Sequence, residues 1–285
     1  MKNRLNTMLK ILRKHYAEYG TWEVNDLPVG NTLKVNNDKN KYLIKKHMNL
    51  IWPNRKKLET LYSDCCKADI VPPILPSDSG QLLLETPEGI FSLQKMISGR
   101  APMPRDMNLL SHAIPKLHAI LAASSVKKLQ NHLNFTVKDI RKSAEQYGYC
   151  QYLKILEEAL DIFSTEPRQI IHGDLHKGNL LIANNRVIFL DLDSATESNI
   201  FQDIIFLGYR INSHNKIKIN QFINSFHLIP HTKSYSLKFY FPLLIYTILQ
   251  RILFIFIRRD MGEDQWMNDL DNQKNFLLNA NKLRH

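Results

Sequence analysis

The stretch that decides the fold is IIHGDLHKGNLLIANNRVIFLDLDSA, residues 170–195, in which polar side chains stand at the edges of two aliphatic runs. The runs on either side of the asparagine pair predict a β-hairpin, because Asn tolerates the left-handed backbone angles that tight turns require. With residues 184–186 as the loop, Ala183 faces Val187. The neighbouring polar groups then gather at the open end of this hairpin.

Three oxygen-bearing side chains meet at that open end. Stepping outward along the predicted hairpin pairs Asn179 with Asp191, and Asp174 precedes Asn179 in the loop that enters the hairpin. An amide oxygen and a carboxylate, completed by phosphate oxygens and water, suit Mg²⁺. A second carboxylate on the preceding loop is placed to accept the proton of an attacking hydroxyl. The arrangement predicts phosphoryl transfer, in which positioning and charge neutralisation supply most of the catalysis.

Length and composition are those of a globular protein. The 285 residues suffice for one large domain or two modest lobes, and 44% of them are hydrophobic. The three cysteines match neither a disulfide framework nor the paired spacing of a zinc site. We therefore expect a reducing, cytoplasmic compartment.

Two segments bear on membrane contact. The N-terminal 20 residues lack the uninterrupted apolar run of a signal peptide, and their apolar residues fall at helical spacing, which predicts an amphipathic helix. The most apolar segment, residues 239–257, is interrupted by Pro242, Gln250 and Arg251. We expect it to be a buried core helix, with a membrane-facing surface as the alternative.

The positive charge of the chain is concentrated near its N-terminus. The formal net charge is +11, and residues 1–67 contain 14 Lys plus Arg against 6 Asp plus Glu. Such a field favours an anionic partner, whether nucleotide phosphate, nucleic acid or an acidic membrane surface. A solvated basic face is the alternative. Nucleic acid is not expected, because no basic motif is interleaved with aromatic residues.

The order of predicted elements is strand-rich first and helical afterwards. The predicted elements are an N-terminal helix, strands within residues 21–28, 32–35 and 41–47, a helix within 52–68, a hairpin over 81–96 turning on TPEG, and helices from residue 106 onward. This order predicts an α+β fold with a small β-rich lobe, residues 1–97, and a larger mainly helical lobe, residues 98–285. Gly99, Pro102 and Pro104 mark a hinge between them.

HGDLHKGN (residues 172–179), followed by FLDLD (residues 189–193), resembles the H-G-D-x-H-x-x-N plus I-D-x-D signature of the aminoglycoside phosphotransferase and choline kinase family. That family shares the two-lobed protein-kinase-like fold. The resemblance implies ATP as cofactor together with Mg²⁺, and Asp174 as the catalytic base. It implies Asn179 and Asp191 as metal ligands, with Asp193 either a further ligand or a support for the metal site.

The resemblance also implies a nucleotide site in the first lobe. Lys45 occupies the place of the third-strand lysine that contacts the α- and β-phosphates, and Glu59 is its predicted acidic partner, with an exposed helical glutamate as the alternative. Gly30 would let backbone amides approach the phosphates. Lys95 and Met96 lie where the family presents backbone hydrogen bonds to adenine.

Other residues of the catalytic region receive roles from the same resemblance. His176 is predicted to contact the transferred phosphate, a charge that Lys177 could supply instead. His172 is predicted to brace the catalytic loop, Asp203 to anchor it through hydrogen bonds, and His118 to be structural.

The short spacing after the metal motif limits the class of acceptor that we expect. Only 11 residues separate Asp191 from Asp203, which leaves no platform for a peptide and favours a hydroxyl of a small molecule or sugar. One alternative is a kinase of a membrane glycolipid, such as a lipopolysaccharide core sugar, in peripheral contact with the inner membrane face. A non-catalytic nucleotide-binding regulator is disfavoured because the predicted catalytic residues are present. The acidic segment GEDQWMNDLD, residues 262–271, could line a pocket for a cationic acceptor, with an exposed acidic helix as the alternative.

Overall fold

The computed structural model of the chain describes residues 2–24, 31–37, 40–47, 55–126, 129, 137–165, 168–212, 215–226, 237–260, 262 and 264–283. Its α-helices are α1 (Lys2–His15), α2 (Arg55–Lys67), α3 (Met107–Ala123), α4 (Val137–Gln146), α5 (Leu153–Thr165), α6 (Ile200–Ile211), α7 (Lys216–Asn224), α8 (Leu237–Asp260) and α9 (Leu270–Asn281). Its strands are β1 (Glu23–Val24), β2 (Thr32–Asn37), β3 (Asn40–His47), β4 (Ile74–Leu75), β5 (Leu84–Thr86), β6 (Gly89–Lys95), β7 (Arg168–Ile171), β8 (Leu180–Ala183), β9 (Arg186–Phe189) and β10 (Thr196–Asn199). Short 3-10 helices include η3 (Pro104–Asp106), η5 (Lys177–Asn179), η6 (Leu192–Ser194) and η7 (Asp264–Asp269).

The N-terminal part is built on an antiparallel sheet. Six strands pair in the order β1-β2-β3-β6-β4, with β5 also on β6. Met8 and Leu12 of helix α1, and Tyr16 just after it, are buried together with Val35 and Ile44 of the sheet, which confirms the predicted amphipathic helix. The predicted hairpin on TPEG is the β5–β6 pair, in which Thr86 faces Gly89.

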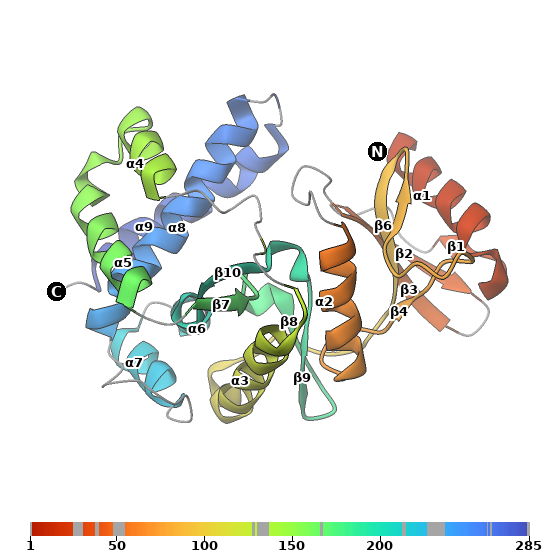
Figure 1. Ribbon diagram of the computed structural model, residues 1–285, viewed down its shortest axis with the longest axis horizontal. Coiled ribbons are helices and arrows are strands. Elements are labelled where there is room, and N and C mark those ends of the chain that lie inside the picture. The colour runs from red at the N-terminus through yellow and green to blue at the C-terminus, as the bar shows by residue number, and fades with distance from the viewer. Residues whose placement is uncertain are drawn as a thin grey trace.

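The C-terminal part is mainly helical and is organised around α8, which contacts α4, α5, α6, α7 and α9 (Figure 1). One described helical segment, Tyr240–Asp260, is long and apolar enough to cross a membrane by length and composition, but 89% of its 18-residue apolar window is buried inside the protein. This burial confirms the prediction of a core helix. Together with the strand-rich N-terminal part, it gives the predicted α+β fold.

The apolar cores do not divide where the predicted lobes do. The smaller cluster is formed by α1 and the sheet. The larger cluster contains the residues of the helical part and also Leu58, Leu61 and Tyr62 of α2. In Figure 1, α2 accordingly lies between the sheet and the β8–β9 hairpin. The predicted boundary at residue 97 is therefore not a boundary between two cores.

The β8–β9 hairpin forms as predicted, but its register differs by one residue. Ala183 pairs with Arg186 instead of Val187. Asn184 and Asn185 alone form the loop, at φ values of 48° and 56°. Positive φ at both central residues is the requirement of the two-residue type I′ turn, whose twist matches that of the flanking strands. The predicted three-residue loop, and the direct pairing of Asn179 with Asp191, are wrong.

The connection that leaves β6 is hydrogen-bonded to the same hairpin. The Arg100 amide donates to Ile182 O at 3.2 Å, and the Ile182 amide donates to Arg100 O at 2.7 Å. A Cβ placed on Gly99 would lie 3.0 Å from Ile182 O, so the two backbones approach closely. The segment predicted to be a hinge is thus attached to β8.

Candidate functional site

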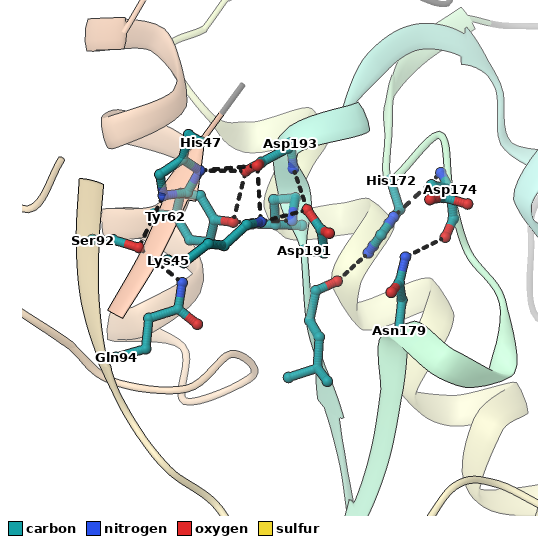
Figure 2. A network of polar contacts seen from close by, with 12 residues as sticks. Lys45, His47, Tyr62, Ser92, Gln94, His172, Asp174, Asn179, Asp191 and Asp193 are labelled. Atoms are coloured by element: carbon teal, nitrogen blue, oxygen red, sulfur yellow. Dashed lines mark hydrogen bonds and ion pairs between the residues drawn. The ribbon is translucent and has the colours of Figure 1, made fainter. Parts of the chain in front are cut away.

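The site is formed by the loop between β7 and β8 and by the residues that follow β9. Asn179 Nδ2 donates to Asp174 O at 2.9 Å, and the Leu190 amide donates to Asn179 O at 2.9 Å, immediately before Asp191. Figure 2 shows the three predicted groups together at the open end of the hairpin. The structure thus brings Asp174, Asn179 and Asp191 into one site, although the strand register differs by one.

Asp203 anchors the catalytic loop through hydrogen bonds to its backbone. Its carboxylate is 2% exposed and accepts from the amides of His172 at 2.9 Å and Gly173 at 3.0 Å, and it contacts His118 Nε2 at 3.0 Å. The buried His172 ring extends this support, because its Nε2 donates to Leu190 O at 2.8 Å. The predicted anchoring role of Asp203 and the predicted bracing role of His172 are confirmed.

A glycine is required where the two loops of the site meet. Gly173 has a φ of 77°, which L residues rarely adopt, and a Cβ there would lie 2.1 Å from Ser194 O. The backbone before Asp174 therefore fits directly against the backbone after Asp191. The positions of the two carboxylates are coupled through this contact.

Lys45 joins the N-terminal sheet to this site. Its Nζ lies 2.7 Å from Asp191 Oδ1 and 2.8 Å from Asp193 Oδ2. Burial opposes the charged form, but the two carboxylates outweigh it and hold the pKa of Lys45 above its ordinary value. Lys46 instead lies 5.9 Å from the centroid of the Phe91 ring. Of the two adjacent lysines, Lys45 is the one that reaches the site.

Asp193 is the centre of a buried polar network, shown in Figure 2. Its oxygens accept from Lys45 Nζ and from Tyr62 Oη at 3.1 Å, and one lies 2.8 Å from His47 Nδ1. Burial raises the pKa of Asp193, but His47 and Lys45 more than compensate and hold it well below the usual range. Both oxygens are occupied within the protein. These contacts support Asp193 as a residue that fixes the lysine, and a direct contact of Asp193 with the metal stays a prediction.

Glu59 does not pair with Lys45. Its carboxylate accepts from Arg55 Nη1 at 2.9 Å and from the Leu82 amide at 2.8 Å. The predicted Lys45–Glu59 pair is wrong in this structure, because the carboxylates after β9 take the lysine. Helix α2 instead contributes Tyr62, whose hydroxyl contacts Asp193 and accepts from the Leu192 amide at 3.2 Å.

The backbone predicted to face adenine is partly engaged within the protein. The Lys95 amide donates to Pro73 O at 2.8 Å and the Met96 amide to Lys41 O at 2.9 Å, and the contact of these residues with adenine stays a prediction. Among the described contacts, the amides of the next residues, Ile97 and Ser98, have no backbone partner. Gly30 lies outside the described residues.

The donor set at the open end fits a hard divalent cation. Asp191 Oδ1 accepts from Lys45, and Asn179 Nδ2 is used as a donor, whereas the described contacts leave Asp191 Oδ2 and Asn179 Oδ1 unused. The Asp191 side chain is 44% exposed, which makes it accessible to a ligand. No group of three or more His, Cys, Asp or Glu able to hold a metal occurs among the described residues. A carboxylate plus an amide, completed by nucleotide phosphates, is the set that Mg²⁺ uses.

Asp191 also has an uncommon backbone conformation, with φ 60° and ψ 67°. Asp is among the few non-glycine residues that adopt this left-handed region, and such conformations cluster at functional sites. The conformation lets the Asp191 carboxylate accept from the Asp193 amide at 3.4 Å.

Sequence reasoning missed the residue that contacts the predicted base. Arg251 of α8 forms an ion pair with Asp174 Oδ1. Burial raises the pKa of Asp174, but Arg251 and then His176 outweigh this and keep it below its ordinary value. The one available signal was an arginine inside the most apolar segment of the chain, which needs a polar partner when that segment is buried.

His176 lies beside the carboxylate of Asp174. Its Nδ1 accepts from the Gly178 amide at 2.9 Å, which leaves the ring proton on Nε2, 3.5 Å from Asp174 Oδ1. Burial lowers the pKa of His176, with Arg251 and Arg210 acting in the same direction against Asp174. His176 is therefore a neutral neighbour of the carboxylate near pH 7.

This site and fold define a phosphotransferase that acts on a hydroxyl group. The family model described as the phosphotransferase enzyme family matches residues 71–216, just over half of the chain. The chain belongs to this family. A search of curated proteins gave no match.

Solved structures with the kinase-like fold agree. Choline kinase LicA from Streptococcus pneumoniae is 14% identical, with a TM-score of 0.72 over 100% of this chain and 99% of that one. Spectinomycin phosphotransferase APH(9)-Ia, in complex with ADP and spectinomycin, is 13% identical, with a TM-score of 0.64 over 98% of each chain. Amicoumacin kinase hAmiN, in complex with AMP-PNP, Ca²⁺ and Ami, is 15% identical, with a TM-score of 0.67 over 99% of this chain and 96% of that one. At this identity the likeness shows a shared fold.

Proposed function

We propose that the protein transfers the γ-phosphate of ATP, with Mg²⁺, to a hydroxyl group of a small molecule or sugar. The observation that carries this proposal is the convergence of Asp174, Asn179 and Asp191 at one end of a hairpin, with Lys45 of the sheet paired to Asp191. These are the groups that phosphoryl transfer needs for the proton, the metal and the phosphates.

On the nucleotide side, residues 1–97 bind ATP and residues 98–285 supply the catalytic loop and the acceptor site. Lys45 contacts the phosphates, and backbone groups of Ile97 and Ser98 contact adenine. Asn179 and Asp191 would hold Mg²⁺, which neutralises charge on the phosphates and fixes their orientation. Gly30 remains a proposed phosphate contact.

On the acceptor side, Asp174 orients the hydroxyl and takes its proton. The hydroxyl oxygen bonds to the γ-phosphorus as the bond from that phosphorus to the β–γ bridging oxygen breaks, and the proton passes to a carboxylate oxygen of Asp174. The low pKa of Asp174 keeps it ionised and ready to accept the proton. His176, held by Gly178, lies beside this oxygen and contacts the transferred phosphate.

We expect this reaction to take place in the cytoplasm, where ATP is available. The glycolipid alternative gains no support from the fold, because the aromatic and aliphatic segment that motivated it belongs to α8, whose apolar window is 89% buried. Of the basic residues in the N-terminal part, Lys45 is the one that the described contacts place at the proposed nucleotide site.

Asp174→Asn and Asp191→Asn test the assignment, with Asp271→Asn on the exposed face of α9 as the matched control. Asp174→Asn should retain ATP binding and lose transfer by two to four powers of ten, as for removal of a positioned base. Asp191→Asn should weaken Mg²⁺-dependent ATP binding itself. The measurements are ADP release over a panel of sugars, amino alcohols and hydroxy acids, and ATP titration with and without Mg²⁺. Binding of Mg²⁺ and ATP without turnover on any acceptor would contradict the proposal and favour a regulator.

A further inference from the structure

Two arginines flank the same aromatic ring beside the proposed base. The Arg251 guanidinium carbon of α8 lies 4.4 Å from the centroid of the Phe206 ring, and that of Arg210 of α6 lies 5.7 Å from it. Arg210 also lies 4.0 Å from the centroid of the Phe276 ring. Stacking on aromatic faces fixes each guanidinium plane and leaves its N–H groups to point outward at the edges.

Only one of these arginines has a carboxylate partner. Arg251 pairs with Asp174, and its buried Nε has no hydrogen-bond partner. Among the described residues, no carboxylate lies within ion-pair distance of Arg210. The charges of Asp174 and Asp269 act on Arg210 from farther away. Asp174 is already paired with Arg251, and Asp269 is exposed, with its two oxygens accepting from Asn272 and Gln273.

The charge beside the base is therefore positive. Arg251 neutralises Asp174, His176 is neutral near pH 7, and Arg210 adds a positive charge without a partner. Burial and the charge of Arg251 lower the pKa of Arg210, against the opposing charges of Asp174 and Asp269, and the guanidinium stays charged near pH 7. A cationic acceptor would meet repulsion here, whereas an oxyanion would satisfy the unused N–H groups.

We propose that Arg210, together with Arg251, binds an oxyanion of the acceptor, so that the substrate is a hydroxyl compound carrying a carboxylate or phosphate group near the phosphorylated hydroxyl. This inference rests on the proposed function and names its substrate class. Arg210 is a specificity-determining residue in this arrangement. Arg251 serves both the base and the acceptor anion.

The acidic segment considered for a cationic acceptor does not offset this charge. Its described carboxylates, Asp269 and Asp271, are exposed to solvent. A purely structural role accounts for Arg251, which compensates a partly buried carboxylate, whereas the stacking of Arg210 on Phe276 leaves its guanidinium without a carboxylate within ion-pair distance among the described residues. The second arginine is thus the residue to test.

A panel of matched acceptors tests the substrate class. Glucose, glucosamine, glucuronate and glucose 6-phosphate share a skeleton and differ in charge, and the last two distinguish a carboxylate from a phosphate. The anionic members should have a kcat/KM at least tenfold above the neutral and cationic ones. Preference for glucosamine or glucose would overturn the inference while leaving the proposed function intact.

Substitutions at Arg210 separate recognition from folding. Arg210→Gln should raise KM for the anionic acceptors by about 10- to 100-fold, the loss expected for a charge-assisted bidentate contact, with kcat and KM for ATP little changed. Arg210→Lys keeps the positive charge but lacks the forked guanidinium, so its KM for the anionic acceptors should lie between those of the parent and Arg210→Gln. Arg259→Gln is the control, because Arg259 lies on α8 and stacks on Phe256 at 5.0 Å but pairs with Asp260, and it should match the parent. A KM for anionic acceptors that Arg210→Gln leaves unchanged would overturn the inference.

Binding of inorganic phosphate gives a readout without turnover. The full chain is first saturated with AMP-PNP and Mg²⁺ to occupy the nucleotide site, and phosphate is then titrated by calorimetry. The parent and Arg259→Gln should bind phosphate, and Arg210→Gln should bind it at least tenfold more weakly. Absence of phosphate binding by the parent, or equal binding by Arg210→Gln, would refute the anion site. If these titrations succeed while no acceptor turns over, the proposed function fails and the anion site stands.

Discussion

Lys45 is held by the part of the chain that carries the metal motif, and not by the helix that follows its own strand. Asp191 and Asp193 take the two ion-pair positions, and Tyr62 of α2 reaches the same cluster through its hydroxyl. Because Asp193 is also held by His47, its position is determined by three neighbours at once. The lysine position therefore depends chiefly on Asp193.

Substitutions of Asp193 and of Glu59 should show which of these two carboxylates holds Lys45. Asp193→Asn breaks a buried ion pair and should lower the free energy of unfolding by about 3 kcal/mol and weaken ATP binding. Glu59→Gln keeps an oxygen that accepts from the Leu82 amide, so it should change ATP affinity little. Urea denaturation and ATP titration measure both effects. A larger loss of ATP affinity in Glu59→Gln than in Asp193→Asn would contradict this assignment.

The pairing of Arg251 with Asp174 predicts a pH effect. The pKa of Asp174 is lower in the folded chain than its unfolded value of about 3.9, so its contribution to stability is present above that value and is lost as the pH falls through the lower folded pKa. The Arg251→Gln variant lacks the positive charge that counters the effect of burial, so the pKa of Asp174 should be higher than in the parent. The acid limb of the pH profile of kcat/KM should then move to higher pH than in the parent. An acid limb at the same pH in both proteins would show that Arg251 does not control the base.

The β8–β9 hairpin is the element that the sequence predicts best, although the sequence does not determine its strand register. The motif places Asp174, Asn179 and Asp191 together because the loop and both strands are local in sequence. The register depends on whether two or three residues form the turn, and the asparagine pair is compatible with both until φ at Asn184 and Asn185 is known. The one-residue shift leaves the site intact because its groups lie at the strand ends.

Substitutions at Asn185 should change stability only through the backbone conformation. The Asn185 side chain is exposed, and its φ is 56°. Asn185→Val should lower the free energy of unfolding by about 1–2 kcal/mol, because a β-branched residue is strained at positive φ. Asn185→Gly is the matched control and should be neutral or slightly stabilising. Thermal denaturation compares the three proteins. Equal stability of the Val and Gly variants would argue against a type I′ turn.

The residues that the sequence could not predict are those whose partners are distant in the chain. Arg251 and Asp174 are 77 residues apart, and their contact depends on how α8 packs against the catalytic loop. Glu59 and the backbone near Lys95 satisfied a local pattern, but long-range packing gave them other partners. Patterns along the sequence identify which groups carry the chemistry, whereas partner choice follows from tertiary packing.

At the scale of the whole molecule, α2 makes the two parts interdependent. Leu61 of α2 is fully buried in the larger apolar cluster, and α2 contacts α3. A fragment of residues 1–97 would expose this helix face, so it should not fold cooperatively on its own. Leu61→Ala in the full chain should lower stability by about 2–5 kcal/mol in a single transition. Urea denaturation followed by circular dichroism tests both, and a stable fragment or a separate early transition would contradict the shared core.

The attachment of the connecting segment to β8 limits how the protein can open for its substrates. Since Arg100 is hydrogen-bonded in both directions to Ile182, residues from Gly99 onward travel with the catalytic hairpin. A swing of the sheet relative to this hairpin, to admit ATP or release ADP, would bend the chain between Met96 and Gly99, the short piece of backbone proposed to face adenine, and would separate Lys45 from Asp191 and Asp193. Nucleotide exchange and the opening motion would share one pivot, so a bound base would itself restrain the movement that releases it.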